Sequence, residues 1–270
     1  TVKVKFSAPW GPFNYYMSMM DVTAIPSMKA AEEKGRDLNL SPVGSGPFKF
    51  VEWVPQSHIK AERNQDYAWA PEMFENKGAP YIDDLTIKFI TDRSTLVACL
   101  ESGDCDIVKD PNYTDLVRLK NDPAYKIDRI QQTGVPFSFT FNTVRWPTSE
   151  LEVRKAINLA IDRERVSKAA FLGMRDPFYT VLAEATPEVW MGAKDLIYFK
   201  PEDATKVLTD AGWVDTDKDG ILEKDGKPLE LDMYVFGSQE ANPSVIAAES
   251  MQADLKEIGM KVNIQVRPWD

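Results

Sequence analysis

Residues 229–270 follow a strand, helix, strand order, and this order restricts the fold more than any other feature. Residues 229–237 (LELDMYVFG) alternate apolar and polar side chains, as a half-buried strand does. Residues 242–259 (NPSVIAAESMQADLKEIG) have helical spacing and end in a glycine, and residues 261–270 (KVNIQVRPWD) give a second strand pattern. A helix between two strands makes a right-handed parallel crossover, so the sequence predicts an α/β fold.

Shorter strand and helix patterns fill the rest of the chain and predict mixed sheets. A long helix over residues 149–171 carries one apolar stripe, at positions 153, 156, 157, 160 and 161. A helix over 91–103 begins at Asp92 or Ser94, whose side chains can cap it, and a helix over 200–213 ends at Gly212. Further helices are predicted at 9–20 and 110–122, and strands at 2–6, 42–55 (after a glycine turn), 57–67, 81–90, 105–108 and 125–143, the last interrupted at Gly134.

Charge and hydropathy argue against two classes of protein. The chain has 42 acidic and 32 basic residues, a net charge of -10 and no dense Lys/Arg cluster, so nucleic acid is a poor partner. No apolar run approaches the roughly 20 residues that span a bilayer. Hydrophobic residues make up 43% of the chain, which suffices for one large or two ordinary domain cores.

Cysteine and histidine limit the available chemistry. Cys99 and Cys105 lie six residues apart, without the C-x-x-C spacing of a redox motif. They can form a disulfide or stay free, and we favour free thiols because cysteine is so often buried. The only histidine, His58, has polar neighbours on its face of a strand pattern, so we expect it to be exposed. A single histidine argues against histidine-based triads and multi-histidine metal sites.

The segment DTDKDGILEKDGKPL begins like a calcium-binding loop. Asp215, Asp217 and Asp219 stand at alternate positions ahead of a glycine, as the first ligands of an EF-hand do. Position 12 of such a loop needs a bidentate glutamate but is Gly226 here, and Pro228 blocks the helix that should follow. The segment fits a polar hairpin with an Asp-Gly turn better, and the three aspartates stay weak calcium candidates.

Six separated parts of the chain carry a common resemblance. They are TVKVKFSAPWGPF, PVGSGPFKFVEW with ERNQDY, FITDRSTLVACLESGDCDIV, FNTVRWPTSELEVRKAINLAIDRERV, DATKVLTDAGW with DTDKDGILEKDGKPLEL, and AAESMQADLKEIGMKVNIQ. In this order they resemble the extracellular solute-binding proteins of the oligopeptide and dipeptide class, bacterial solute-binding protein family 5. No single stretch is specific, but the ordered set is, and it covers most of the chain. In many relatives the aspartate-rich segment is a hairpin, which further disfavours calcium.

The resemblance implies a periplasmic-binding-protein-like fold, in which two α/β lobes with mixed sheets close on a ligand about a hinge. Residues 1–133 are then part of lobe one, 134–141 the hinge strand, and 142–270 part of lobe two, ending at the second hinge crossing. The hinge is placed at Gly134 and Pro136 because the pattern of the chain changes there. Family members are longer, so the resemblance also implies a partial chain, incomplete at both ends.

Ligand-binding residues are expected in loops at the ends of strands, as in other open α/β sheets. The candidates are Ser45, Asn112, Phe137, Ser138, Phe139, Ser238, Gln239 and Glu240. The alternatives are ordinary turn formers for Ser45 and Asn112 and core aromatics for the two phenylalanines. In dipeptide-binding relatives an arginine shortly before the NP pair holds the peptide carboxylate. Gln239 and Glu240 occupy that place here, which argues against a dipeptide ligand specifically.

The function that the resemblance implies is the substrate-binding component of an ABC importer. Such a protein is periplasmic or extracellular, which is compatible with a lipid anchor, and delivers a peptide or another small solute, such as an oligosaccharide, to permease subunits. We expect a monomer without a cofactor and without catalytic residues. Two alternatives stay open: a glycosidase-type hydrolase, which needs a carboxylate pair that no motif marks, and a calcium-stabilised binding module built on the aspartate-rich segment.

Overall fold

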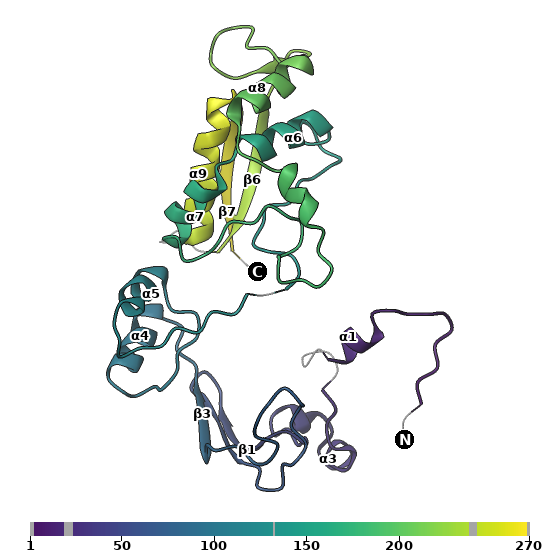
Figure 1. The fold of residues 1–270 in the computed structure, drawn as a ribbon, viewed down its shortest axis with the longest axis vertical. Coiled ribbons are helices and arrows are strands. Elements are labelled where there is room, and N and C mark those ends of the chain that lie inside the picture. The colour runs from purple at the N-terminus through teal and green to yellow at the C-terminus, as the bar shows by residue number, and fades with distance from the viewer. Residues whose placement is uncertain (1–2, 19–23, 132, 238–241, 269–270) are drawn as a thin grey trace. The chain divides into compact units, whose positions relative to one another are not determined.

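The computed structural model describes residues 3–18, 24–131, 133–237 and 242–268. The chain divides into two compact units, Thr1–Asp106 and Ile107–Asp270, and Figure 1 labels most of their helices and several of their strands. The predicted hinge strand, residues 134–141, lies inside the second unit, and the assignment of residues to lobes stays a prediction. Among the described residues, no helix combines the length and the apolar character needed to cross a lipid bilayer.

The first unit contains a three-stranded antiparallel sheet. β1 (Phe48–Val54) and β2 (His58–Arg63) form the predicted hairpin, and β3 (Asp84–Lys88) pairs with the other edge of β2. The register shifts between Phe50 and Glu52, which marks an irregularity in β1. All three strands lie where the alternation of apolar and polar residues predicts them.

Two of the helices described in the first unit, α3 (Met28–Lys34) and α4 (Arg93–Glu101), begin at side chains that cap them. The other helices described there are α1 (Phe13–Met17) and the 3-10 helix η1 (Gly35–Asn39). At the start of α4 the Asp92 carboxylate accepts a hydrogen bond from Thr95 N at 2.7 Å, which confirms Asp92 as the cap. Ser27 accepts in the same way from Ala30 N at the start of α3.

A disulfide joins Cys99 and Cys105, so the preference for free thiols is wrong. The chain turns after α4 through Gly103, whose φ of 80° is a left-handed conformation that glycine adopts without strain. The turn brings the two Cα atoms to 5.3 Å, within disulfide reach, and Cys105 N donates to Cys99 O at 2.9 Å. Sequence spacing alone does not reveal this reversal of the chain.

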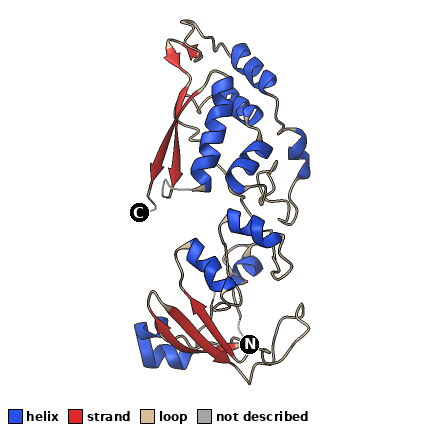
Figure 2. Cartoon of the chain, turned by 90° about the vertical axis from the view of Figure 1, so that its left-hand side faces the viewer, coloured by secondary structure: helices blue, strands red, loops and turns tan. Residues whose placement is uncertain are grey.

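The second unit contains the predicted strand, helix, strand crossover. β6 (Glu230–Phe236) and β7 (Lys261–Arg267) pair in parallel, with Glu230 opposite Lys261 and Phe236 opposite Arg267. The 15-residue helix α9 (Pro243–Glu257) connects them and begins at Asn242, whose Oδ1 accepts from Ser244 N at 2.9 Å. Figure 2 shows the helices gathered on one face of this strand pair.

Four more helices complete the second unit. They are α5 (Tyr113–Lys120), α6 (Leu151–Ala160), α7 (Arg163–Phe171) and α8 (Pro201–Asp210), with the 3-10 helix η2 (Met191–Asp195) between α7 and α8. The single helix predicted over 149–171 is therefore two helices. Ile161 is extended (φ -87°, ψ 119°), and the carboxylate of Asp162 accepts from Arg165 N at 3.0 Å and starts α7. The local capping group overrides the continuous apolar period.

The predicted apolar stripe of α6 lies in the main core of the second unit. All five of its positions are buried, against residues of α8, α9 and the β6–β7 pair. Trp213, after α8, is fully buried, and its Nε1 donates to Glu150 Oε2 at 3.3 Å. The other core members are Ala204, Leu208, Leu229, Met233, Val235, Val245, Ala248, Leu255, Ile258, Met260 and Val262.

The aspartate-rich segment ends in the predicted hairpin. β4 (Glu223–Lys224) and β5 (Lys227–Pro228) pair in antiparallel fashion. Asp225 and Gly226 form the turn with φ angles of 52° and 70°, the positive values that a two-residue hairpin turn requires.

Three predicted strands are absent from the described residues. Residues 3–6, 105–108 and most of 125–143 carry strand-like alternation, but no regular secondary structure is present in their described residues. A strand becomes stable only when its backbone groups pair with a neighbour, and alternation along one segment does not supply that neighbour.

Candidate functional site

The carboxyl ends of β6 and β7 define one end of the second unit. Both strands run in the same direction, so Phe236 and Arg267 lie at this shared end. In open α/β sheets, ligands bind outside the carboxyl ends of the strands. The candidate site is therefore sought among the side chains that other elements bring to this end.

Helix α7 reaches the same end because it runs antiparallel to α9. Arg165, near the start of α7, forms an ion pair with Asp254, near the end of α9. Phe171, the last residue of α7, packs with Ala247, near the start of α9. Since α9 begins just after the carboxyl end of β6, the carboxyl end of α7 lies on the candidate side of the unit (Figure 1).

Four rings form an aromatic cluster there: Tyr113, Phe137, Phe139 and Phe171. The ring centroids of Phe171 lie 5.4 Å from Tyr113 and 5.6 Å from Phe137, in edge-to-face geometry. Phe137 and Phe139 are 5.8 Å apart. Phe139 also packs against the main core, whereas Phe137 is 46% exposed. The aromatic cluster thus joins the core to a partly open apolar surface.

Arg175 lies over this aromatic cluster. Its guanidinium carbon is 5.1 Å from the ring centroid of Phe171 and 5.7 Å from that of Tyr113, within the range of cation–π attraction. Among the described residues, no carboxylate forms an ion pair with Arg175. The carboxylate of the next residue, Asp176, lies 3.5 Å from Arg129 instead.

The backbone that carries Arg175 is fixed by hydrogen bonds. The buried hydroxyl of Ser167 donates to the carbonyl of Arg175, and Met174 N donates to Phe171 O at 2.8 Å. Arg129 donates to Met174 O at 3.0 Å. Leu172 ends α7 with a left-handed φ of 51°, which turns the chain back toward the aromatic cluster.

The predicted ligand residues fall into four groups. Phe137 and Phe139 belong to the aromatic cluster, and Ser138 lies exposed between them. Asn112 caps α5, since its Oδ1 accepts from Asp115 N at 2.8 Å and its amide donates to Asp115 Oδ2 at 2.6 Å. Ser45 lies in the first unit, where its carbonyl accepts from Trp69 Nε1 at 3.0 Å. Ser238, Gln239 and Glu240 lie outside the described residues, and the ligand-binding role of the whole set stays a prediction.

Tyr113, Phe171 and Arg175 were missed by the sequence reasoning. Tyr113 and Phe171 are helix-terminal residues, and their contact depends on the packing of α5 against α7, which local spacing does not reveal. The one available signal is the segment GMRDP, which places Arg175 just after the glycine that follows α7.

The four carboxylates of Asp215, Asp217, Asp219 and Glu223 lie together at the aspartate-rich segment. One oxygen from each lies within 4.8 Å of the others, so the group could hold a metal ion. The same side chains close the loop by themselves: Asp215 accepts from Lys218 N at 2.7 Å and Gly220 N at 3.1 Å. The remaining acceptors of this loop are Asp217 for Asp219 N, Asp219 for Ile221 N, and Glu223 for the amide and hydroxyl of Thr216. Asp215, Asp217 and Asp219 stay weak calcium candidates.

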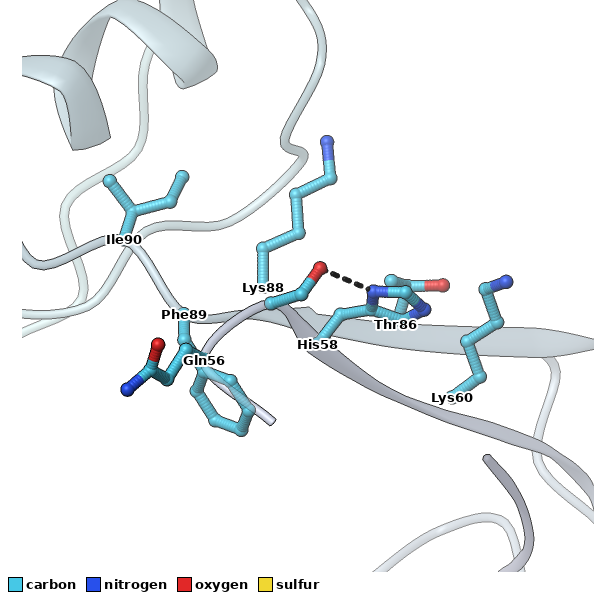
Figure 3. Close-up of a pocket in the computed structure, with 8 residues that line it drawn as sticks. Gln56, His58, Lys60, Thr86, Lys88, Phe89 and Ile90 are labelled. Carbon is cyan, nitrogen blue, oxygen red and sulfur yellow. Dashed lines mark hydrogen bonds between the residues drawn. The ribbon is translucent and has the colours of Figure 1, made fainter. Parts of the chain in front are cut away.

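Two wide depressions contain no residue of the aromatic cluster. One, of about 490 Å³, is in the first unit (Figure 3) and is lined by Gln56, Ser57, His58, Lys60, Thr86, Lys88, Phe89 and Ile90. The other, also about 490 Å³, is lined by Glu152, Lys155, Val207, Asp210, Ala211 and Lys224. Neither contains a predicted ligand residue. We place the candidate site at the aromatic cluster because it combines a strand-end position with a fixed cation.

His58, in the first depression, is half-buried, so the prediction that it is exposed is wrong. Its Nε2 lies 3.2 Å from Glu52 Oε1, and its Nδ1 lies 2.8 Å from Ser57 Oγ. Lys60 and His58 both hydrogen bond to Glu52, and these bonds lower the pKa of the Glu52 carboxyl. The strand prediction for His58 is confirmed, but the cross-strand carboxylate draws its ring toward the sheet.

Comparison with known proteins places the chain among binding proteins. The family model described as bacterial extracellular solute-binding proteins, family 5 middle, matches residues 1–270. The oligopeptide-binding protein AppA of Bacillus subtilis (strain 168) is 31% identical, over 99% of this chain and 48% of its own length. Heme-binding protein A of Haemophilus influenzae is 29% identical, over 93% of this chain and 43% of its own length.

Solved structures show the same fold. The crystal structure of NikA from Brucella suis in complex with Fe(III)-EDTA superposes with a TM-score of 0.69 and 28% sequence identity, over 84% of this chain and 44% of that chain. The chain spans about half the length of the relatives that it matches. The predicted periplasmic-binding-protein-like fold is confirmed.

Proposed function

Because the chain belongs to family 5 of the bacterial extracellular solute-binding proteins, we propose that it is part of the substrate-binding component of an ABC importer and that its ligand is a peptide. The observation that carries the proposal is the match of the family model to all 270 residues. The family and the relatives named above are binding proteins and not enzymes, which confirms that expectation and leaves the hydrolase alternative without support.

A peptide is the favoured ligand for two reasons. The oligopeptide-binding relative has 31% identity over nearly the whole chain. The exposed part of the aromatic cluster offers apolar contact area, while Arg175 offers a charge, and a peptide carries both kinds of group. The sequence GSQEANP, without an arginine before the NP pair, favours a ligand longer than a dipeptide.

The proposed mechanism is capture between two lobes. Residues 1–133 supply part of one cleft wall and residues 142–270 part of the other, and the segment 134–141 acts as a hinge strand. Phe137, Ser138 and Phe139 would contact the ligand from the hinge, and Ser45 and Asn112 from the loops. Closure excludes water and strengthens polar contacts with the ligand.

The partners and location follow from the same proposal. The protein works outside the cytoplasmic membrane and passes its ligand to ABC permease subunits. It is a monomer, and its full-length form carries a lipid anchor. The family is extracellular by description. The Cys99–Cys105 disulfide fits an oxidising compartment, where such bonds persist.

The test is a thermal-shift screen of the full-length protein against peptide and oligosaccharide libraries, with calorimetry on the best hit. We expect peptides of three or more residues to raise the melting temperature and oligosaccharides to leave it unchanged. Stabilisation by oligosaccharides alone would overturn the peptide assignment while keeping the importer assignment. A melting temperature that rises with calcium alone would favour the calcium-stabilised module.

A further inference from the structure

Arg175 differs from Arg118, Arg129 and Arg154 in what surrounds its charge. Arg129 is paired with Asp176, Arg118 with Asp115, and the guanidinium of Arg154 donates to the carbonyls of Thr148 and Ser149. Arg175 has two aromatic faces instead, and no carboxylate partner among the described residues. The chain has a net charge of -10, so most of its basic groups have acidic partners available. Arg175 lies at the strand-end side of the unit, where an external anion can pair with it.

The surroundings also hold the guanidinium in place before any ligand arrives. Ser167 and Met174 fix the backbone on either side, and the rings of Phe171 and Tyr113 support the planar group. Pre-organisation of this kind lowers the entropy that a ligand must offset on binding.

We propose that Arg175 is a ligand-binding residue that pairs with a carboxylate of the bound peptide, while the aromatic cluster packs against the neighbouring apolar part. The planar fork of arginine matches a carboxylate with two parallel hydrogen bonds. This inference rests on the proposed function. The carboxylate can be the peptide's C-terminus or an Asp or Glu side chain, and the two sources require separate arms in the test.

The experiment uses the full-length protein and three pools of random tripeptides to pentapeptides. The first pool has no Asp or Glu and free C-termini, the second is the same pool with amidated C-termini, and the third is amidated with one Glu at a random position. Equilibrium dialysis followed by mass spectrometry measures the affinity of retained peptides. The proteins are wild type, Arg175→Gln, Arg175→Lys and the control Lys168→Gln, which removes a charge from the exposed face of α7.

We expect Arg175→Gln to weaken binding of a carboxylate-bearing pool by about tenfold to a hundredfold and to leave the uncharged amidated pool unchanged. Arg175→Lys should recover part of the loss, and Lys168→Gln should match wild type. A preferential loss with the first pool assigns Arg175 to the C-terminus, and with the third to an acidic side chain.

Two results would contradict the inference in distinguishable ways. If wild type binds the pools but Arg175→Gln weakens all three equally or none, Arg175 does not read a carboxylate and only this inference fails. If wild type binds no pool, the peptide function fails and the inference fails with it. The melting temperatures of the variants distinguish the loss of a ligand contact from the loss of the fold. If Arg175→Gln does not fold, the affinities of Arg175→Lys for the three pools decide the test.

Discussion

At the scale of single residues, the buried Asp254 connects α7 to α9 in the second unit. It is 9% exposed, and its carboxylate accepts hydrogen bonds from Asp162 N, where α7 begins, and from Arg165. Arg165 also donates to the carbonyl of Ser250 on α9 at 3.1 Å. One carboxylate therefore fixes the start of α7 against α9, and the position of α7 sets the position of Phe171.

Replacing Asp254 by alanine should destabilise the second unit by about 1–3 kcal/mol, because a partly buried amide and a guanidinium lose their acceptor. Equilibrium unfolding in urea, followed by circular dichroism, measures the free energy of unfolding. The matched control is Glu249→Ala on the exposed face of α9, which should change it by less than about 0.5 kcal/mol. Equal losses in the two variants would show that the Asp254 contacts contribute nothing specific.

The Asp254 carboxyl should also give the stability a defined pH dependence. Burial raises its pKa above the ordinary value of 3.8, against the opposing hydrogen bond from Asp162 N and the charge of Arg165. The folded state then binds a proton more tightly than the unfolded state, so this group stabilises most at low pH and loses that contribution as the pH rises through its folded pKa. Asp254→Asn cannot titrate.

Relative to wild type, Asp254→Asn should therefore become more stable as the pH rises from about 4 to about 7. Thermal unfolding of both proteins across that interval measures the change. A difference that is constant with pH, or that moves in the opposite direction, contradicts the raised pKa of Asp254.

At the scale of elements, the disulfide fixes the end of α4 to the turn that follows it. Closing so short a loop should contribute about 2 kcal/mol by restricting the unfolded chain. Reduction with dithiothreitol should lower the melting temperature of the first unit, and a Cys99→Ser, Cys105→Ser double variant should melt at the reduced value whether or not reductant is present. If reductant leaves wild type unchanged, the disulfide does not form or does not stabilise this unit.

The same scale shows what the sequence could predict. Helix α4 and the β4–β5 hairpin depend on neighbours within a few residues, such as Asp92 for Thr95 N and Asp225-Gly226 for the turn, and both were predicted. The break between α6 and α7 was missed, although its cause, Asp162, is also local, because the apolar period continues through it. The strands expected at 2–6 and 125–143 depend on a distant partner that no local pattern identifies.

The candidate site divides in the same way. Phe137 and Phe139 were predicted from their position next to Gly134, while Arg175 and Tyr113 reach the aromatic cluster only because α5, α7 and α9 pack together. A contact between helices depends on how the whole unit packs. Local sequence patterns therefore do not predict that Tyr113 and Arg175 come together.

At the scale of the whole molecule, the two units differ in how much apolar surface they bury. Among the described residues of the first unit, Ala30 and Val97 are the only buried apolar residues, whereas the second unit contains the main core. Buried apolar contacts determine which segments resist local opening. The backbone amides of the two units should therefore differ in their protection against hydrogen exchange.

Hydrogen–deuterium exchange should show the slowest amides in α6, α9, β6 and β7, and faster exchange through the first unit. Peptides from β1, β2 and β3 serve as the internal comparison, since they are also in regular secondary structure. Equal protection of the amides in the two sheets would show that the buried apolar area of each unit does not determine how readily it unfolds locally.

The Asp225-Gly226 turn has a practical consequence for protein engineering. It is exposed, and it precedes β6, so it lies at the amino end of that strand, opposite the end where the aromatic cluster and Arg175 gather. Exposed hairpin tips accept inserted sequence better than most positions. A fluorescent reporter domain inserted between Asp225 and Gly226 would leave the proposed ligand surface uncovered, which makes this turn the natural attachment point for an optical sensor of the ligand.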